Sequence, residues 1–221
     1  MQRLFDVVFS GLALVLLSPF LIPLAVFLKL TGEGEIFFLQ DRIGINGEIF
    51  KLLKFATMLK DSPNIGNGTV TLHKDPRILP MGHFLRNTKI NELPQLLNIF
   101  RGDMSIIGPR PQAKRSFDAY SESAKKSIIK VRPGLSGVGS IAFRNEEAMI
   151  HANNSPDIFY DNTVMPFKGS LEEWYVSNQS LKVYFAMIIL TVVAVVNPSS
   201  KLMWNLFKDI PRPPKELQQW V

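Results

Sequence analysis

Arginine, lysine and carboxylate side chains alternate in a dense block over residues 73–111. Arginines placed among turns and helix starts are good phosphate binders, because the guanidinium fork matches phosphate oxygens. A carboxylate near them can hold Mg2+, which usually bridges one or two carboxylates and a substrate diphosphate. Ordinary surface ion pairs would give the same composition, so composition alone does not decide for a phosphate site. The charged residues of the block are Arg77, Arg86, Lys89, Arg101, Arg110, Asp75, Glu92 and Asp103.

The bulk composition narrows the classes of partner. The chain has 221 residues, 46% of them hydrophobic, and a formal charge of +6. A basic excess is typical of proteins that bind nucleic acid, an anionic membrane surface or a phosphorylated ligand. No nucleic-acid module is recognisable, so we expect no nucleic-acid partner. The absence of cysteine excludes disulfides and thiolate metal sites, and the histidines His73, His83 and His151 lack metal-ligand spacing.

An uncharged, almost wholly apolar stretch covers residues 7–28, between Arg3 and Lys29. It is long enough to cross a hydrocarbon layer of about 30 Å as a straight helix. A cleaved signal peptide is disfavoured, because no small-residue cleavage site follows and Pro19 and Pro23 interrupt the run. A plain transmembrane helix is a serious alternative.

The Ser18-Pro19 break favours a different shape for this segment. A proline inside a helix loses one hydrogen bond and clashes with the preceding turn, at a cost of roughly 3 kcal/mol. In lipid the freed carbonyl needs another donor, and the Ser18 hydroxyl is well placed to supply it. Two half-helices at an angle would dip into one leaflet and return, and basic residues at both ends fit the cytoplasmic side. We therefore expect a re-entrant membrane segment over residues 1–30.

Residues 31–221 are expected to form one domain of the α+β class, mostly helical, with a small β-hairpin. The strands are predicted at 35–40 and 49–55, joined by the turn signal Asn46-Gly47. Residues 108–111, Gly-Pro-Arg-Pro, must form a rigid extended turn. Helices are predicted at 80–86, 90–101, 112–130 and 181–196. The helix at 181–196 is short for a membrane span, so we expect an interfacial or a core helix. The aromatic and basic residues after it suit a membrane interface, and the alternative is a packed C-terminal helix with a solvated tail.

Short motifs follow one another over nearly the whole chain. They are Arg3-Leu4-Phe5-Asp6, Ser18-Pro19, Gln40-Asp41-Arg42-Ile43-Gly44, Phe50-Lys51, Lys54-Phe55, Phe84-Leu85-Arg86, Glu92-Leu93-Pro94-Gln95-Leu96, Gly102-Asp103-Met104-Ser105, Gly108-Pro109-Arg110-Pro111, Pro133-Gly134-Leu135-Ser136-Gly137 and Trp174-Tyr175-Val176. On these motifs the chain resembles the bacterial sugar transferase family, and within it the small monotopic phosphoglycosyl transferases. A lone Gly-Pro-Arg-Pro is weak evidence, but this many blocks in the family's order is strong.

The resemblance implies a re-entrant membrane helix, interfacial amphipathic helices and a catalytic domain at the cytoplasmic face of a bacterial inner membrane. It implies transfer of a phosphosugar from a UDP-sugar to polyprenyl phosphate, with release of UMP and with Mg2+ as cofactor. Such a reaction is the first membrane step of glycoconjugate or surface polysaccharide synthesis, lipopolysaccharide included. The implied partners are the UDP-sugar, polyprenyl phosphate and membrane phospholipid, and a homodimer is an option that the sequence leaves open.

The resemblance also assigns roles to residues. In the family an Asp-Glu pair carries the chemistry: the aspartate attacks the β-phosphate to give a covalent phosphosugar-enzyme, and the glutamate helps to hold the metal. Here the pair is Asn91-Glu92. We predict Asn91 at the nucleophile position, Glu92 as a catalytic residue and metal ligand, and Arg86 and Arg110 as phosphate contacts. The other predicted substrate- or phosphate-binding residues are Pro111, Arg77, Arg144 and Asp103.

Asn91 is the most consequential departure from the family pattern, because a neutral carboxamide cannot form the acyl phosphate that an activated aspartate forms. The chain is then a natural branch that uses Glu92, Asp103 or direct attack by the lipid phosphate, or carries an introduced substitution, or has lost catalysis. Ala56, Glu172 and the segment 137–144 also depart, so we favour a divergent branch. The retained arginines and Glu92 favour an active enzyme. The first alternative is an inactive membrane-bound protein that binds substrate or serves in assembly, and the second is a lipid-surface scaffold.

Overall fold

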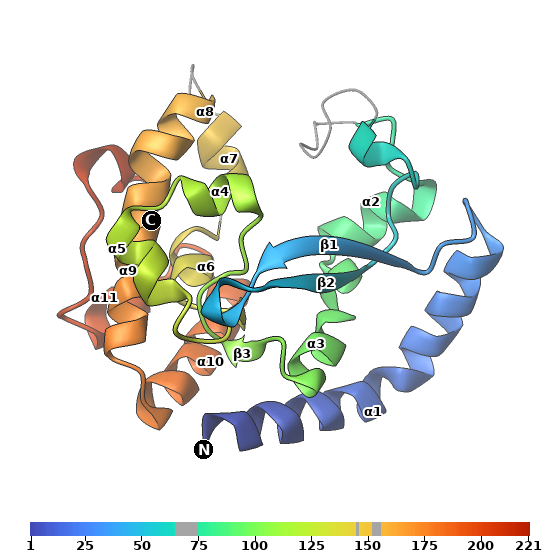
Figure 1. The fold of residues 1–221 in the computed structure, drawn as a ribbon, viewed down its shortest axis with the longest axis horizontal. Helices are drawn as coiled ribbons and strands as arrows, with labels where there is room; N and C mark the ends of the chain where they lie inside the picture. Colours follow the sequence, from blue (N-terminus) through green and yellow to red (C-terminus); the bar gives the residue numbers. More distant parts are fainter. Residues whose placement is uncertain (65–74, 145, 152–155) are drawn as a thin grey trace. The chain divides into compact units, whose positions relative to one another are not determined.

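The computed structural model of the chain describes residues 1–64, 75–144, 146–151 and 156–221, and Figure 1 shows the order of its elements. The chain forms two compact units. Unit 1 comprises Met1–Asp6, Arg42–Phe50 and Gly102–Val221, and unit 2 comprises Val7–Asp41 and Lys51–Arg101. The predicted division into a membrane segment of residues 1–30 and a domain of residues 31–221 follows membrane location rather than packing, and it stays a prediction.

The described elements are mainly helical, as predicted, with two small sheets. From the N-terminus to residue 101 they are α1 (Gln2–Leu30), β1 (Phe37–Ile43), η1 (Ile45–Gly47), β2 (Ile49–Phe55), η2 (Ser62–Asn64), α2 (Pro80–Asn87), η3 (Ile90–Glu92) and α3 (Gln95–Arg101). From residue 102 onward they are β3 (Ser105–Ile107), α4 (Lys114–Asp118), α5 (Glu122–Ile128), β4 (Gly134–Ser136), α6 (Val138–Ala142), α7 (Glu146–His151), α8 (Pro156–Phe159), η4 (Tyr160–Val164), α9 (Met165–Ser177), α10 (Leu181–Val196), α11 (Leu202–Leu206) and η5 (Lys215–Leu217).

The N-terminal helix α1 passes through both prolines without interruption, so the expected pair of separate half-helices is wrong in this detail. The Ser18 hydroxyl donates to the Val15 carbonyl at 2.7 Å. That carbonyl would otherwise have received the N–H that Pro19 lacks, so the predicted role of Ser18 is confirmed. The helix continues because the lost bond is replaced, and Figure 1 shows the helix after residue 7 changing direction along its length.

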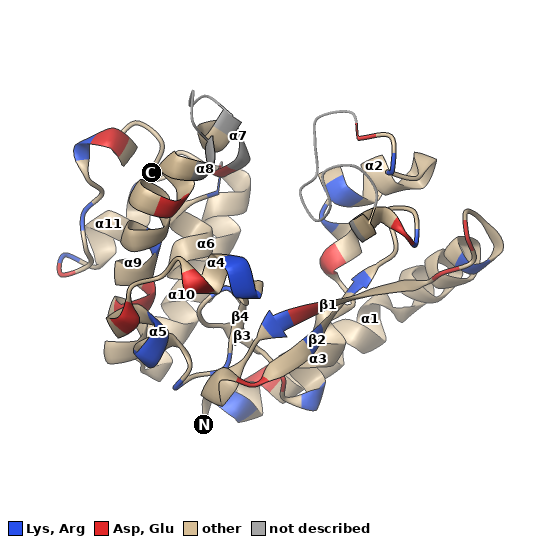
Figure 2. Ribbon diagram, turned by 45° about the horizontal axis from the view of Figure 1, so that its top comes forward, with Lys and Arg blue, Asp and Glu red and all other residues tan. Residues whose placement is uncertain are grey.

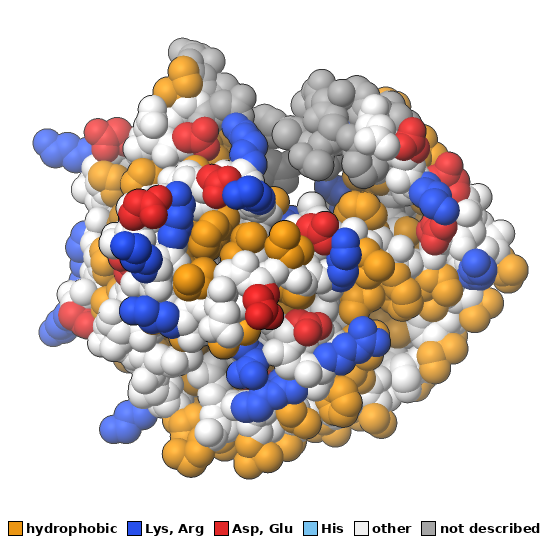
Figure 3. Space-filling model, viewed as in Figure 1, with side chains coloured by type: hydrophobic (Ala, Val, Ile, Leu, Met, Phe, Trp, Pro, Cys, Tyr) orange, Lys and Arg blue, Asp and Glu red, His pale blue; other side chains and the backbone are white. Residues whose placement is uncertain are grey.

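The surface of α1 is apolar. Figure 2 shows an uncharged ribbon along most of it, and Figure 3 shows hydrophobic side chains over its exposed length. Val15 and Phe20 are 70% and 74% exposed, respectively. Within the part of the chain that the structure describes, α1 alone is long and apolar enough to cross a membrane.

The core of unit 2 contains Leu28 of α1, Phe55 of β2 and Leu85 of α2. These two helices therefore pack against strand β2 of the hairpin. Asn98 of α3 fixes β2, because its Oδ1 accepts from the Leu53 N–H and its Nδ2 donates to the Lys51 carbonyl, both at 2.9 Å. The predicted single helix over 90–101 is instead η3 followed by α3, divided at Leu93-Pro94, where the proline cannot continue a helical hydrogen-bond ladder.

Unit 1 is built around α6, which packs against both α9 and α10. The predicted helix over 181–196 is confirmed as α10, whose first turn is capped by the Ser180 hydroxyl at 3.2 Å from the Val183 nitrogen. One face of α10 is buried through residues such as Tyr184 and Met187, so it is a core helix on that side. The predicted single helix over 112–130 is two helices, α4 and α5, with the Ser121 hydroxyl capping α5.

The C-terminal segment after α10 packs onto the same core. Met203, Trp204, Ile210 and Leu217 are buried within it. The Trp174 Nε1–H of α9 donates to the Asp209 carboxylate at 2.8 Å. The alternative of a solvated tail is therefore wrong at Ile210 and Leu217, which are buried because this segment packs onto the core of unit 1.

The first turn of α1 is attached to unit 1 by a buried carboxylate. Asp6 is 2% exposed, and its Oδ1 accepts from the Ser105 hydroxyl at 3.0 Å, the Ile106 N–H at 3.0 Å and the Tyr184 hydroxyl at 2.9 Å. Hydrogen bonds to a charged acceptor are stronger than neutral ones. The carboxylate therefore fixes the start of α1 to β3 and α10.

We expect Tyr184→Phe to destabilise the protein by about 2 kcal/mol, because one donor to a buried carboxylate is lost. Thermal unfolding in detergent micelles measures this. The matched control is Tyr120→Phe, whose hydroxyl is also buried but is 3.4 Å from the Gln112 amide nitrogen. Equal losses in the two variants would contradict the role given to Asp6.

Candidate functional site

The loop that carries Arg110 follows directly after β3, which pairs in parallel with β4. The pairing continues past β3 into the loop. The Gly108 N–H donates to the Ser136 carbonyl at 2.9 Å, and the Gly134 N–H donates to the Pro109 carbonyl at 2.8 Å. Gly-Pro-Arg-Pro and Pro-Gly-Leu-Ser-Gly, distant in the sequence, therefore form one hydrogen-bonded structure.

Glycine is required on both sides of this contact. A Cβ at Gly108 would overlap the Arg132 carbonyl oxygen, and a Cβ at Gly134 would overlap the Gly108 nitrogen. Backbone segments this close leave no room for a side chain. The two motifs therefore contain glycine for the same physical reason.

A third motif, Gln40-Asp41-Arg42-Ile43-Gly44, contributes its last three residues to the same region. The Arg42 guanidinium donates to the Pro111 carbonyl at 3.3 Å, and the Ile43 N–H donates to the Gln112 carbonyl at 3.0 Å. The Gly-Pro-Arg-Pro loop is thus fixed from two sides of unit 1. This places Pro111, one of the predicted site residues, as a backbone anchor.

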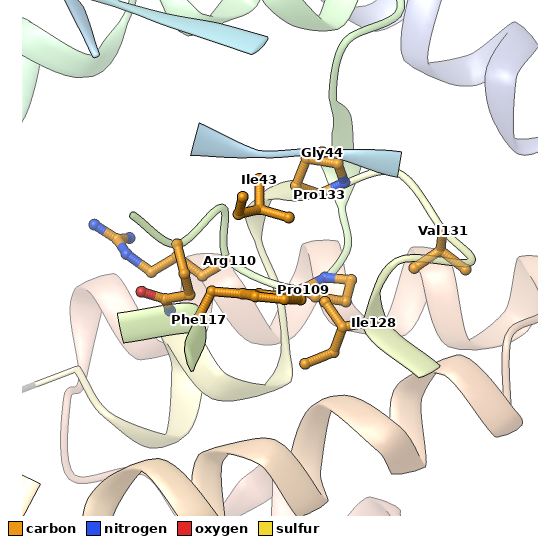
Figure 4. A pocket seen from close by; sticks show the side chains of 9 residues that line it. Ile43, Gly44, Pro109, Arg110, Phe117, Ile128, Val131 and Pro133 are labelled. Carbon is orange, nitrogen blue, oxygen red and sulfur yellow. The ribbon is translucent and has the colours of Figure 1, made fainter. Parts of the chain in front are cut away.

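A small hollow lies beside this loop. Figure 4 shows Ile43, Pro109, Ile128 and Val131 around it, with the Arg110 guanidinium pointing away from Ile128 and Val131. Its enclosed volume is only about 10 Å3. Ligand pockets usually measure about 300–1,000 Å3, so the hollow is far too small for a nucleotide sugar. Phosphate binding by Arg110 would take place outside it.

A buried charge lies against the Arg110 loop. Glu172 of α9 is 0% exposed, and its Oε1 is 3.5 Å from the Arg110 backbone nitrogen, the outer limit of a hydrogen bond. Its Oε2 has no hydrogen-bond partner among the described residues. Burial raises the pKa of Glu172 to about 7, against the opposing effects of Lys168 and of the backbone N–H groups of Arg110 and Gly139.

Lys168, one turn earlier on α9, is buried as deeply. It is 1% exposed, and its Nζ donates to Glu146 of α7 at 2.7 Å. The same ammonium lies 5.4 Å from the centroid of the Phe143 ring. Unit 1 therefore contains a line of charges that runs from the half-buried Glu146 of α7 through the buried Lys168 and Glu172 of α9 to the Arg110 loop.

Asn91 and Glu92 lie on η3 in unit 2, next to α2, which carries Arg86. The segment begins at Lys89, whose φ of 60° is in the left-handed region and turns the chain between the two elements. Asn91 is buried, and its Oδ1 has no hydrogen-bond partner among the residues that the structure describes. An amide oxygen of this kind is ready to accept from, or bind to, a ligand.

Glu92 and Arg86 have contacts inside unit 2. Glu92 Oε1 lies 3.9 Å from Lys54 Nζ, which comes from β2. One guanidinium nitrogen of Arg86 lies 3.5 Å from the Met58 sulfur. The structure therefore gathers Arg86, Asn91, Glu92 and Lys54 in one region of unit 2.

The remaining predicted site residues are dispersed. Arg77 in unit 2 is 5% exposed and binds both oxygens of Asp75, at 2.8 and 2.6 Å, and the Ser62 carbonyl at 2.7 Å. Asp103 in unit 1 is half-buried and follows Gly102, while Arg144 is exposed just after α6. The phosphate-binding roles of these three residues stay predictions.

The sequence analysis assigned no role to the buried pair Lys168 and Glu172. Two opposite charges four residues apart on a helix usually form a surface ion pair. The apolar neighbours on α9 argue against that interpretation, because Phe167, Leu171 and Trp174 are all buried. A charged pair inside an otherwise buried helix face indicates burial of the charges too.

Comparison with known proteins supplies the identity that the geometry alone does not. The profile of the bacterial sugar transferase family matches residues 1–198. The chain belongs to this family. The resemblance read from the motifs is thereby confirmed, and the match includes every candidate site residue described above.

Three relatives illustrate the range of the sugar transferase family. The exopolysaccharide production protein ExoY of Sinorhizobium fredii is 35% identical over 208 residues, which cover 88% of this chain and 84% of that relative. The UDP-glucose:undecaprenyl-phosphate glucose-1-phosphate transferase of Escherichia coli is 38% identical over 143 residues, covering 64% of this chain and 31% of that protein. The undecaprenyl-phosphate galactose phosphotransferase of Salmonella typhimurium is 30% identical over 211 residues, covering 89% of this chain and 40% of that protein.

The oxygen donors around η3 suit a hard cation such as Mg2+. Glu92 offers a carboxylate, and the neighbouring Asn91 has a buried amide oxygen with no partner among the described residues. Among those residues, no three His, Asp or Glu side chains form a metal cluster. Mg2+ commonly binds through one or two protein oxygens together with substrate phosphates, so the donor set fits that mode rather than a closed protein cage.

We expect the buried Glu172 carboxyl to make the stability of the protein depend on pH. Its pKa is raised from 4.5 to about 7 on folding, so the folded state holds the proton more tightly, and stability falls as the pH rises from about 4.5 to about 7. Glu172→Gln removes this effect and should be more stable than the natural chain by about 3 kcal/mol at pH 8, with little difference at pH 5.

Thermal unfolding at the two pH values measures the difference. Glu173→Gln, the neighbouring and partly exposed glutamate of α9, is the control and should change stability little at either pH. A Glu172→Gln variant that is destabilised equally at pH 5 and pH 8 would contradict the assignment.

Proposed function

We propose that this chain transfers a phosphosugar from a UDP-sugar to polyprenyl phosphate and releases UMP, as the first membrane step of polysaccharide or glycoconjugate synthesis. The observation that carries this proposal is the family match, since relatives within it are named as undecaprenyl-phosphate sugar phosphotransferases. These relatives bear out the activity predicted from the motifs. They do not favour the alternative of an inactive binding or assembly protein.

The chemistry requires that two anions meet. In the net reaction an oxygen of polyprenyl phosphate forms a bond to the β-phosphorus of the UDP-sugar, and the bond from that phosphorus to the oxygen of UMP breaks. Electrostatic repulsion opposes the approach, so guanidinium groups that bind the phosphates lower the barrier. Arg110 in unit 1 and, separately, Arg86 in unit 2 are each proposed as a phosphate contact.

We assign the metal site to Glu92, with Mg2+ as the proposed cofactor. A bound Mg2+ would supply positive charge against the diphosphate of the donor. Asn91 has no carboxylate with which to form an acyl phosphate, so its proposed role is to position a ligand through its unpartnered Oδ1.

The proposed location is the cytoplasmic face of the bacterial inner membrane, with α1 dipping into one leaflet. Membrane association is supported by the family and by the exposed apolar surface of α1. The helix has Arg3 before its apolar run and Lys29 at its end, and positive residues prefer the cytoplasmic side. Two prolines within one helix favour a bend over a straight span.

We expect Glu92→Ala to lower UMP release from a UDP-sugar, with polyprenyl phosphate and Mg2+ present, by about 100-fold or more, because the proposed metal ligand is lost. A panel of UDP-sugars is tested on each variant. Glu35→Ala, an exposed glutamate paired with Lys60, is the control and should release UMP at the natural rate. Unchanged activity of Glu92→Ala would remove the metal-site assignment.

Asn91→Asp separates an active divergent enzyme from an inactive one. We expect the natural chain to release UMP with at least one donor, whether or not Asn91→Asp is faster. If the natural chain is silent with every UDP-sugar while Asn91→Asp turns over, the chain is the inactive family member of the alternative. Turnover measured with both variants side by side decides between them.

The topology of α1 can be tested by cysteine labelling without background labelling of other positions, because the sequence contains no cysteine. One cysteine is inserted after Met1 in one variant, and Thr31→Cys, at an exposed position after α1, provides the other. A membrane-impermeant maleimide should label both from the cytoplasmic side only. Labelling from opposite sides would show that α1 spans the membrane and would overturn the re-entrant topology.

A further inference from the structure

The buried carboxyl of Glu172 touches the loop on which Arg110 sits. α9 brings this side chain to the loop from inside unit 1, where it is 0% exposed. A buried carboxyl without full pairing is costly, and one of its oxygens has no hydrogen-bond partner in the described part of the chain. A structural core gains nothing from such a group, so its contacts indicate another role.

Glu172 joins two backbone segments. Its carboxylate is within reach of the Arg110 N–H, at 3.5 Å from Oε1, and it also accepts from the backbone N–H of Gly139 in α6. A Cβ at Gly139 would overlap Oε1 of Glu172, so the absence of a side chain lets the carboxylate reach α6. One acidic side chain therefore connects the Arg110 loop to the centre of unit 1.

The neighbours of Arg110 in the loop are held by other contacts. Gly108 and Pro109 bond to the β4 segment, and the Pro111 carbonyl accepts from Arg42. Glu172 adds a contact at the backbone of Arg110 itself. The direction in which a side chain leaves the backbone follows the orientation of its own peptide unit, so this contact bears on the guanidinium.

We propose that Glu172 is a positioning residue, which orients Arg110 for the phosphates of the UDP-sugar through the Arg110 backbone N–H. This inference rests on the proposed function, in which Arg110 contacts donor phosphate. The ionised carboxylate is the stronger acceptor, so ionisation of Glu172 holds the loop in its binding arrangement. Protonation leaves a weaker carbonyl acceptor and loosens the loop.

Several charged and titratable groups surround Glu172 and set the pH at which this change occurs. They are Lys168 and Tyr175 on its own helix, Arg110 on the loop, Tyr120 between α4 and α5, and Glu146 on α7, which binds Lys168. Burial raises the pKa of Glu172 to about 7, so the carboxylate forms as the pH rises through neutrality. Donor binding should tighten over the same range.

The test compares the natural chain with Glu172→Gln, which keeps the shape and a neutral acceptor but cannot ionise. We expect Glu172→Gln to raise the KM for the UDP-sugar about fivefold at pH 8, with a smaller change in kcat and little change at pH 6. The ratio of the KM of Glu172→Gln to the KM of the natural chain is taken at each pH, because titration of the substrates affects both proteins equally and cancels in this ratio. Glu173→Gln on the same helix is the matched control and should behave as the natural chain does.

Two further variants separate positioning from general damage to the fold. Glu172→Asp keeps the carboxylate and should retain the pH dependence of KM. Gly139→Ala places a methyl group against Oε1 and should raise KM as Glu172→Gln does. Because Glu172→Gln is also expected to be more stable at pH 8, weaker donor binding in that variant cannot come from unfolding.

The affinity of a UDP-sugar for the same proteins is measured by calorimetry. This measurement needs no turnover, so it tests the role of Glu172 separately from the proposed function. If no UDP-sugar yields UMP with the natural chain, the proposed function fails, while the affinities still test Glu172. Equal affinities of the natural chain and Glu172→Gln at pH 8, or an equal loss in Glu173→Gln, would overturn the positioning role.

Discussion

Unit 1 depends on the approach of two backbone segments at van der Waals contact. Gly108 and Gly134 allow the strands β3 and β4 to remain paired while their loops fold onto each other. Proline on either side of the arginine limits the remaining freedom, so Gly-Pro-Arg-Pro is rigid through both covalent and hydrogen-bonded constraints. The phosphate-binding role proposed for Arg110 would benefit from such rigidity, because less conformational entropy is lost when a ligand binds.

Local signals in the sequence predicted a large part of the fold. Asn46-Gly47 forms the hairpin turn because both residues adopt positive φ, and the apolar run at 181–196 forms α10 within the expected bounds. The helices predicted over 90–101 and 112–130 failed as single elements. Pro94 divides the first. The second is divided between Asp118 and Glu122, where the Ser121 hydroxyl caps α5, and it begins late because the Gln112 carbonyl accepts from the Ile43 N–H, a tertiary contact that no local pattern encodes.

The candidate site was predictable to a different degree. The motif order located Arg86, Asn91, Glu92 and Arg110, but it could not show that Asn91 has a buried oxygen without a partner among the described residues. It also gave no role to Glu172, because its spacing from Lys168 is that of an ordinary exposed pair. Periodicity says which residues share a helix face, whereas only packing says whether that face meets protein or water.

The tail after residue 198 lies outside the family match, yet its side chains complete the core of unit 1. Leu217 and Met203 are as inaccessible as residues of α9, and Asp209 satisfies the indole of Trp174. A shortened chain that ends where the family profile ends would uncover the apolar flank of the helix bearing Glu172 and leave that indole without its acceptor. Family boundaries are therefore a poor guide to the minimal folding length of this protein, and domain swaps among its relatives should carry the tail together with α9.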